Sequence, residues 1–225
     1  MRVHFFSGTA AINDAAYDGC TGLRPDVEWR RFALTDAPSR DAYEREAPEA
    51  DVTISFLNPF VFRDEHLERA GRSYNIHPST PLHPGQDPQH WTIYQGTLMA
   101  GATLHLIERQ VDAGPILDVA EIHVPPDTAP PEINRQSENM ALALLFRRLD
   151  DILAGSLQPI DRQWAGENRR KRSDFVSMCQ ITPDIDPSEL DRRIRSFHVP
   201  TYRNRLQTTI HGQRFVYAGT PDDDR

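Results

Sequence analysis

The strongest constraint on the fold is the alternation of strand-like and helix-like segments in the first half of the chain. Short apolar or alternating runs, typical of strands, occupy residues 3–6, 27–34, 52–56 and 74–77. Between them lie three segments of helical character, residues 13–19, 39–47 and 64–70. Strands that alternate with helices form parallel sheets, because each helix carries the chain back before the next strand. We therefore predict an α/β fold with helices on both faces of the sheet.

The pattern changes after residue 100. Residues 101–109 and 115–124 are strand-like and flank a turn-rich connection, which predicts a hairpin. A long helix is expected over residues 132–154, because apolar residues recur there at helical spacing and Gly155 follows as a stop. That apolar stripe, which should cover the sheet, consists of Leu142, Leu145, Leu149 and Ile152.

The last third of the chain predicts a smaller unit. Residues 157–172 have the composition of a linker and end in an arginine-rich run, residues 169–172. A short helix is predicted over residues 187–197, a β-hairpin over residues 206–217, and a frayed end over residues 220–225. We expect a main domain of residues 1–156 and a small C-terminal α+β extension, residues 157–225, that ends in the hairpin.

Composition excludes several classes of function. The net charge of −8 is opposite to that of most nucleic-acid-binding proteins. No apolar run approaches the ~18 residues of a membrane-spanning helix, and the N-terminus does not resemble a signal peptide. The two cysteines are too far apart in sequence to suggest a paired-cysteine site, and His83, His90 and His105 form no spaced metal set with carboxylates. We expect a cytoplasmic protein that binds neither metal, membrane nor nucleic acid.

The densest group of reactive side chains lies around the fourth predicted strand. Asn75 and His77 are two positions apart, so they project from the same face of a strand. An amide and an imidazole there can donate hydrogen bonds to an oxygen that becomes negative, and a histidine can exchange a proton near neutral pH. Asp112, in the predicted hairpin turn, could orient the histidine or accept a proton. This pattern favours acyl transfer without a protein nucleophile; alternatively, His77 caps a strand end and Asp112 only forms a turn.

The motifs taken in order resemble the formyltransferase family, which includes methionyl-tRNA formyltransferase, glycinamide ribonucleotide transformylase and the sugar N-formyltransferases. The resemblance covers residues 50–155 well and the first 50 residues weakly. The segments that carry it are Asn75-Ile76-His77-Pro78-Ser79, the loop to Gly85, residues 91–96 (WTIYQG), residues 101–105 (GATLH) and residues 111–117 (VDAGPIL).

The resemblance implies a Rossmann-like formyltransferase core and 10-formyltetrahydrofolate as the donor. It also implies a catalytic trio, which falls on Asn75, His77 and Asp112. The pterin pocket of the family uses the chain after the third strand and the loop around the aspartate. Here those positions are Phe56, Asn58, Pro59, Phe60, Val61 and Val111. Phe56 and Phe60 have an alternative interpretation as core residues.

Departures from the family pattern bear on the acceptor. The loop from Ser79 to Gln86, which borders the acceptor site in the family, is shortened, and residues 7–11 lack the phosphate-binding loop of the ribonucleotide enzymes. The C-terminal part is too small for the basic barrel of a tRNA-acting member. The resemblance is therefore greatest to sugar N-formyltransferases, with a dTDP- or UDP-linked amino sugar as the expected acceptor. Trp91 and Tyr94 could stack on its base or simply pack a helix on the sheet.

Other acceptors and other functions are also compatible with this sequence. The acceptor could instead be a free amine, such as hydroxyornithine or an antibiotic precursor. The fold would also suit a formyltetrahydrofolate hydrolase or a catalytically silent ligand-binding protein.

The terminal hairpin exposes short strands that could pair across a two-fold axis, so we expect a homodimer, as in the sugar enzymes that the chain resembles.

Overall fold

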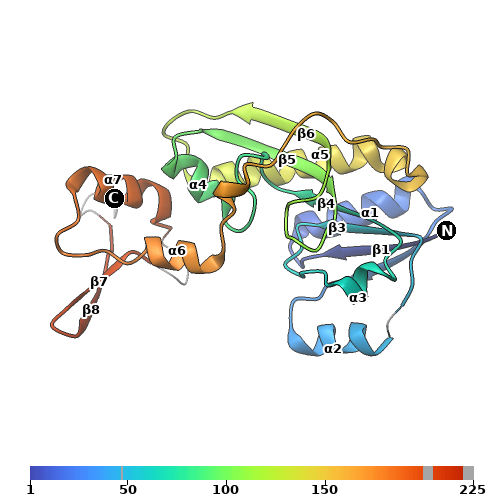
Figure 1. The fold of residues 1–225 in the computed structure, drawn as a ribbon, viewed down its shortest axis with the longest axis horizontal. Helices are drawn as coiled ribbons and strands as arrows, with labels where there is room; N and C mark the ends of the chain where they lie inside the picture. The colour runs from blue at the N-terminus through green and yellow to red at the C-terminus, as the bar shows by residue number, and fades with distance from the viewer. Residues whose placement is uncertain (47, 200–204, 220–225) are drawn as a thin grey trace.

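A single mixed sheet organises the computed structural model, which describes residues 1–46, 48–199 and 205–219 (Figure 1). Its strand order is β2-β1-β3-β4-β5-β6. The first four strands in that order run parallel, whereas β5 is antiparallel to both β4 and β6. The strands are β1 (Arg2–Ser7), β2 (Glu28–Phe32), β3 (Val52–Phe56), β4 (Arg72–His77), β5 (Met99–Leu106) and β6 (Ile116–His123). The predicted α/β fold and the β5–β6 hairpin are confirmed.

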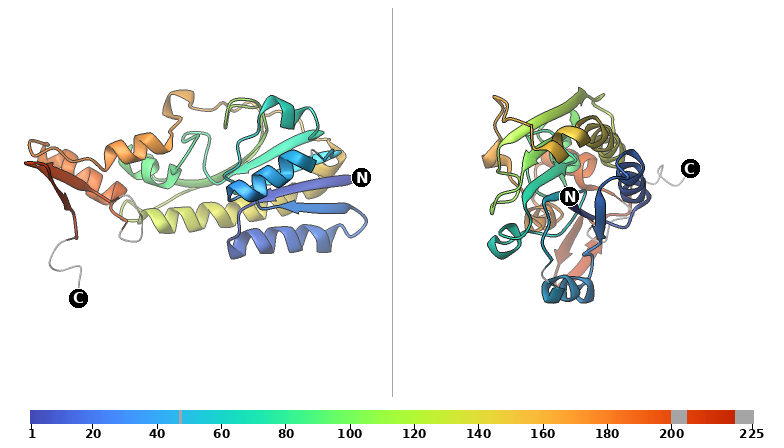
Figure 2. Two further views of the ribbon diagram at one scale, coloured as in Figure 1. Left: turned by 90° about the horizontal axis from the view of Figure 1, so that it is seen from below. Right: turned by 90° about the vertical axis from the view of Figure 1, so that its right-hand side faces the viewer.

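Helices cover both faces of this sheet (Figure 2). On one face, α1 (Ala11–Leu23) and α5 (Pro130–Ala154) pack on a core that includes Val3, Phe5, Ile54 and Ile76. On the other face, α2 (Ala37–Glu46) and α3 (Asp64–Leu67) adjoin an aromatic cluster built around Phe6. Successive residues of β1 thus serve opposite layers, which explains why every residue of that strand after Arg2 is buried.

The long helix α5 buries most of the predicted apolar stripe. Leu145, Leu149 and Ile152 are buried against the sheet, whereas Leu142 is only partly buried. Gly155 follows the helix with φ 66°, a left-handed conformation that ends the helix as expected. The packing of α5 along the sheet also fixes where its first turns lie relative to the end of β4.

The C-terminal third packs beyond one end of the sheet (Figure 1). It contains α6 (Arg172–Met178), α7 (Pro187–Phe197) and the hairpin of β7 (Gln207–Ile210) and β8 (Gln213–Val216). Phe175 and Phe197 pack against Trp91 of α4 (Pro88–Tyr94), so α4 joins this part to the sheet. The hairpin and α7 match the predictions, α6 was not predicted, and the prediction for residues 220–225 lies outside the described residues.

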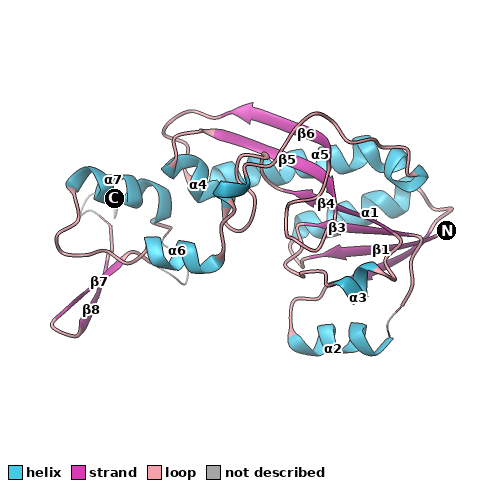
Figure 3. Cartoon of the chain, in the orientation of Figure 1, coloured by secondary structure: helices cyan, strands magenta, loops and turns pink. Residues whose placement is uncertain are grey.

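The segment predicted as a linker is mostly loop, as Figure 3 shows, with one 3-10 turn, η1 (Gly166–Asn168). It does not run free of the sheet, because the Ile160 N–H donates to Ile116 O at the start of β6. Arg162 also forms an ion pair with Glu121 of β6. Within the described ranges, no helix has both the length and the apolar character needed to cross a membrane. The cytoplasmic location stays a prediction.

Candidate active site

A cavity of about 670 Å³ lies at the carboxyl ends of β3 and β4. Its walls come from the loop after β3, the loop after β4 and the β5–β6 connection, and from the first turns of α5. The carboxyl ends of parallel strands in α/β sheets are where ligands bind, because the connections diverge there. The residues that follow Phe56 and His77 therefore border the cavity.

Strand β4 presents two of the predicted catalytic side chains to this cavity. Asn75, Ile76 and His77 all belong to its lining, but the side chain of Ile76 is fully buried in the hydrophobic core. The alternation follows from the pleat of the strand, which sends successive side chains to opposite faces. His77 is only 6% exposed, so its ring is held in the cavity wall.

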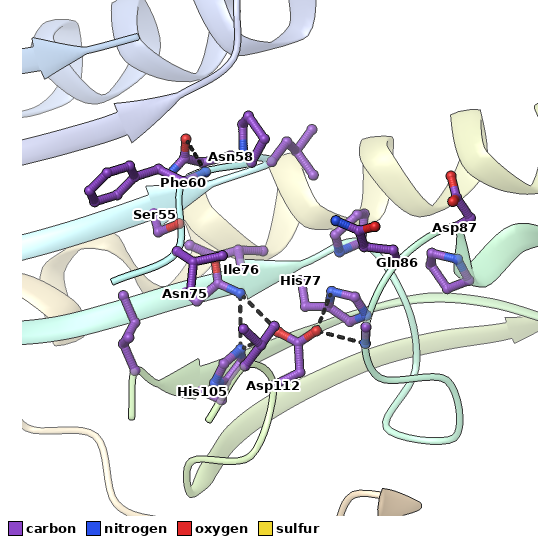
Figure 4. Close-up of a pocket in the computed structure, with 18 of the residues that line it drawn as sticks. Ser55, Asn58, Phe60, Asn75, Ile76, His77, Gln86, Asp87, His105 and Asp112 are labelled. Atoms are coloured by element: carbon purple, nitrogen blue, oxygen red, sulfur yellow. Dashed lines mark hydrogen bonds and ion pairs between the residues drawn. The ribbon is translucent and has the colours of Figure 1, made fainter. Parts of the chain in front are cut away.

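Asp112 completes the predicted trio. Its carboxylate accepts a hydrogen bond of 2.8 Å from the Gly85 N–H and one of 3.4 Å from Asn75 Nδ2. Nδ1 of His77 and Nε2 of His105 each lie 3.4 Å from a carboxylate oxygen of Asp112 (Figure 4). The structure therefore brings all three predicted residues together.

The charge state of Asp112 follows from these contacts. Burial raises the pKa of a carboxyl group, and Asp112 is only 6% exposed. The interactions of Asp112 with His77 and His105 and the hydrogen bond from the Gly85 N–H act in the opposite direction and prevail. The pKa of Asp112 is accordingly lowered well below its ordinary range, so its carboxylate is ionised throughout the physiological pH range.

His105 is a member of this cluster that sequence reasoning missed. Its Nε2 accepts a hydrogen bond of 3.0 Å from Asn75 Nδ2, and its Nδ1 donates to Leu106 O at 2.8 Å. The signal that could have revealed it is the register of the antiparallel pair, since Asn75 and His105 are directly opposite on β4 and β5. In the sequence alone, His105 is the last residue of the GATLH segment and one of three histidines that lack the spacing of metal ligands.

The protons of the two histidines can be placed from their neighbours. A carbonyl oxygen only accepts, so His77 Nε2, 3.1 Å from His83 O, carries a hydrogen, as does His105 Nδ1 beside Leu106 O. The other nitrogen of each ring faces Asp112. A proton that enters the cluster can therefore be held between the carboxylate and either imidazole.

Most of the predicted pterin-binding positions line one part of the same cavity. Asn58, Pro59, Phe60, Val61 and Val111 all do so. Phe56 does not: its side chain is fully buried in the core, which was the alternative interpretation. Asn58 Oδ1 accepts from the Phe60 N–H, and its buried Nδ2 has no hydrogen-bond partner among the described residues.

Of the four predicted acceptor-site residues, Gln86 alone belongs to the described lining of the cavity. Ser79 is buried and its carbonyl accepts a hydrogen bond from Thr103. Trp91 is buried against Phe197, and Tyr94 donates to Glu189 of α7. The two aromatic side chains thus pack α4 against the C-terminal part.

The cavity lining also includes polar residues that sequence reasoning did not single out. Asn134 donates to Glu138 one turn later on α5, and both line the cavity. Arg172 also lines it and donates to Asp87 at 2.7 Å. Of the arginine-rich run, residues 169–172, Arg172 is the residue that lines this cavity.

A separate group of possible metal ligands among the described residues is explained by ion pairing. Glu44, Glu65 and His66 lie close together, but Arg63 pairs with both carboxylates. His66 Nδ1 accepts from the Arg63 N–H, and His66 Nε2 contacts Glu44. The expectation that the protein binds no metal stays a prediction.

Comparison with known proteins places this cavity in a family. The family model described as "Formyl transferase" matches residues 29–149, more than half of the 225 residues. The chain belongs to the formyl transferase family. The matched range includes Asn75, His77, His105 and Asp112, so the whole cluster lies within it, and the predicted family is confirmed.

The individual relatives are more distant. Over 86 residues the chain is 35% identical to the methionyl-tRNA formyltransferase of Roseiflexus castenholzii, a match that spans 38% of this chain and 28% of that protein. A sugar N-formyltransferase from Shewanella shares the fold over 96% of both chains, with 18% identity and a TM-score of 0.79. The formyltransferase PseJ from Anoxybacillus kamchatkensis, solved with UDP-4,6-dideoxy-4-formamido-L-AltNAc and tetrahydrofolate, aligns at 17% identity and a TM-score of 0.60. That alignment covers 77% of this chain and 87% of PseJ. The Rossmann-like formyltransferase fold is thereby confirmed.

Proposed function

We propose that this formyl transferase moves the formyl group of 10-formyltetrahydrofolate to a primary amine. The observation that carries the proposal is the Asp112 carboxylate, buried between two imidazoles and an amide at the wall of a large cavity. A buried ionised carboxylate with two adjacent imidazoles can accept the proton that an attacking amine releases. Membership of the family supports the formyl group as the unit transferred.

The chemistry requires no covalent intermediate on the protein. The amine nitrogen attacks the formyl carbon, and the carbonyl oxygen becomes negative in the tetrahedral intermediate. Asn75 Nδ2 has two hydrogens and two partners, His105 Nε2 and Asp112 Oδ1, so it can keep the shorter contact and turn a hydrogen from Asp112 to the formyl oxygen. The amine loses its proton to the cluster of Asp112, His77 and His105. The bond from carbon to N10 of the folate then breaks, and N10 takes up a proton.

The role of His77 depends on a hydrogen-bond exchange. Both of its ring nitrogens have partners within the chain, His83 O and Asp112. Nε2 can donate to the formyl oxygen only after it leaves the His83 carbonyl. We assign to His77 this donation to the developing oxyanion, and to Asp112 the acceptance of the proton.

The residues after β3 fit the pterin of the donor. Asn58 Nδ2 is a buried donor without a partner among the described residues, which a pterin oxygen or ring nitrogen would satisfy. Phe60 and Val61 add apolar surface, and Val111, which is 44% exposed, stands on the opposite loop. The tetrahydrofolate bound to PseJ supports a folate donor for this chain too.

The acceptor we propose is an amino sugar linked to dTDP or UDP. Gln86, Asn134, Glu138 and Arg172 supply amides, a carboxylate and a guanidinium to the lining of the cavity, groups that suit sugar hydroxyls and a diphosphate. The fold of the Shewanella enzyme and the UDP-linked ligand of PseJ support this class. A free amine remains the alternative acceptor.

The test is a product assay with three arms. Purified protein and 10-formyltetrahydrofolate are incubated with dTDP- and UDP-linked amino sugars, with free amines including hydroxyornithine, or without any amine. We expect tetrahydrofolate and a formamide product only in the first arm. Product in the second arm alone would overturn the nucleotide-sugar acceptor, and formate without an amine would indicate a hydrolase.

We also propose that the protein forms a homodimer through the terminal hairpin. Ile210, Phe215 and Val216 of β7 and β8 are each at least 40% exposed. Exposed apolar side chains on a two-stranded hairpin favour pairing with a second copy.

A further inference from the structure

Residues 164–170, which we call the strap, cross the loops that build the catalytic cluster. The strap lies beyond the segment matched by the family, residues 29–149, and within the stretch that sequence composition identifies as a linker. Its contacts are unlike those of a linker, because they reach the cluster of Asp112, His77 and His105 by three separate routes.

The first route is through backbone hydrogen bonds to the loop after β4. The Ala165 N–H donates to Pro81 O at 2.9 Å, and the Arg170 N–H donates to Pro84 O at 3.1 Å. In return, Arg170 O accepts from the Gln86 N–H at 2.9 Å. These bonds flank Gly85, whose own N–H donates to Asp112 Oδ2. The strap thus holds in place the backbone donor that binds the catalytic carboxylate.

The second route is through side chains to the turn that carries Asp112. Arg169 donates to Asp112 O at 2.9 Å, and Trp164 Nε1 donates to Gly114 O at 2.9 Å. Asp112 has φ 46°, a left-handed conformation that costs a residue with a side chain about 1–2 kcal/mol. Two donors fixed on the strap therefore stabilise a strained turn, one at the carbonyl of the aspartate itself and one two residues after it.

The third route is direct ring contact. The indole of Trp164 meets the imidazole of His105 edge to face, with ring centroids 5.0 Å apart, and that of His77 with centroids 5.9 Å apart. Among the described residues, Trp164 lines a second cavity of about 520 Å³ and not the first. It therefore stands behind the two imidazoles and limits the tilt of both rings.

We infer that Trp164 and Arg169 are positioning residues that set the geometry of Asp112, His77 and His105, and that the strap completes the catalytic cluster. The inference rests on the proposed function, because its main measurement is formyl transfer. Neither residue lines the substrate cavity, so both act through the cluster. A misplacement of catalytic groups by about 1 Å can lower the rate roughly 100-fold.

The experiment compares variants of the full chain in the transfer assay, with the acceptor amine on which the wild type is most active. Arg169→Met and Trp164→Leu should lower kcat about 10- to 100-fold, with KM for 10-formyltetrahydrofolate within about threefold of wild type. Trp164→Phe keeps a ring behind the imidazoles and should retain more activity than Trp164→Leu. Guanidinium added to Arg169→Ala should restore part of kcat.

The matched control is Arg162→Met. Arg162 lies just before the strap, and its side chain forms an ion pair with Glu121 and not with the loops of the cluster. This variant should leave kcat unchanged. If Arg169→Met fails to fold, the milder variants Arg169→Lys and Trp164→Phe are compared with wild type in its place. Wild-type kcat in both Arg169→Met and Trp164→Leu would overturn the inference. Equal changes in kcat, KM and melting temperature in all variants, the control included, would overturn it too.

A second readout does not depend on turnover. The amide signal of Gly85 in an NMR spectrum reports its hydrogen bond to Asp112, and the ring signals of His105 report the contact with Trp164. Both should shift in the strap variants and not in Arg162→Met; unchanged signals would overturn the inference. If the wild type transfers no formyl group while these signals shift, the proposed function fails and the positioning role stands.

Discussion

The backbone N–H of Gly85 donates a hydrogen bond of 2.8 Å to Oδ2 of Asp112. This contact joins the loop after β4 to the β5–β6 connection, two segments that both line the cavity. Gly85 has φ 95°, and a Cβ at this position would lie 2.2 Å from Arg170 O. Only glycine can therefore bring its N–H to the carboxylate while the strap passes so close.

Replacement of Gly85 by alanine should lower both stability and turnover. The added methyl group must displace the Arg170 backbone, and the positive φ adds strain. We expect a loss of about 2 kcal/mol or more in the free energy of unfolding, measured by urea titration. The control is Gly96→Ala, since Gly96 has φ 69° but no atom within 4 Å of the place that an added methyl group would take. Equal losses in the two variants would show that the strap contact contributes nothing.

His105→Asn should reduce turnover with little effect on folate binding. The substitution takes from Asp112 one of its two imidazole neighbours and from Asn75 Nδ2 the nearer of its two hydrogen-bond acceptors. A hydrogen bond to a charged group contributes about 1.5–3 kcal/mol, so kcat should fall about 10- to 100-fold. His123→Asn, at an exposed position on β6, is the control. A wild-type kcat in His105→Asn would exclude His105 from the cluster's function.

The stability of the protein should fall below neutral pH, in part because of His4. Burial, with Arg30 and Arg2 nearby, lowers the pKa of His4 from 6.5 to about 4. In the unfolded chain the imidazole takes up a proton as the pH falls through 6.5, while the folded protein resists protonation down to about pH 4. The unfolded state therefore gains protons first, and stability decreases across this window.

The corresponding experiment is urea unfolding at about pH 7.5 and about pH 5. His4 alone should account for about 2 kcal/mol of the loss in free energy of unfolding between these values. His4→Phe, which keeps a ring against Phe32, should show a loss smaller by that amount. The same loss in both proteins would mean that His4 is protonated to the same extent folded and unfolded.

The homodimer proposal leads to a prediction for Phe215. This side chain is 53% exposed on β8. Light scattering at micromolar concentration should give twice the mass of the 25.6 kDa chain, and Phe215→Glu should give the monomer mass because a charge would be buried in the interface. A wild-type protein that is monomeric at every concentration would rule the dimer out.

The sheet and the centre of the site could be predicted from sequence because their signals are local. The alternating segments before His77 indicate the parallel strands, and the turn around Asp112 indicates the hairpin. Asn75 and His77 share a face by strand geometry alone. The meeting of these side chains with Asp112 required the family resemblance, since no local pattern relates a turn to a distant strand.

The remainder could not be predicted because it depends on contacts between distant segments. Trp164 and Arg169 lie in a stretch whose composition is that of a linker, yet their side chains donate hydrogen bonds to the backbone carbonyls of Gly114 and Asp112. Trp91 and Phe56 were candidates for ligand contact, but tertiary packing buries both. Aromatic residues at the ends of strands and helices serve cores and ligand sites alike, so sequence cannot separate the two roles.

The proposed function requires that Asp112 performs chemistry in this cavity and does not simply shape it. The most direct measurement compares Asp112→Asn with wild type for both kcat of formyl transfer and the Kd of 10-formyltetrahydrofolate. Asparagine keeps the size of the side chain but cannot take the amine proton, so kcat should fall about 100-fold or more while Kd stays within a few-fold. Equal loss of binding and turnover, or turnover at the wild-type rate, would contradict the account.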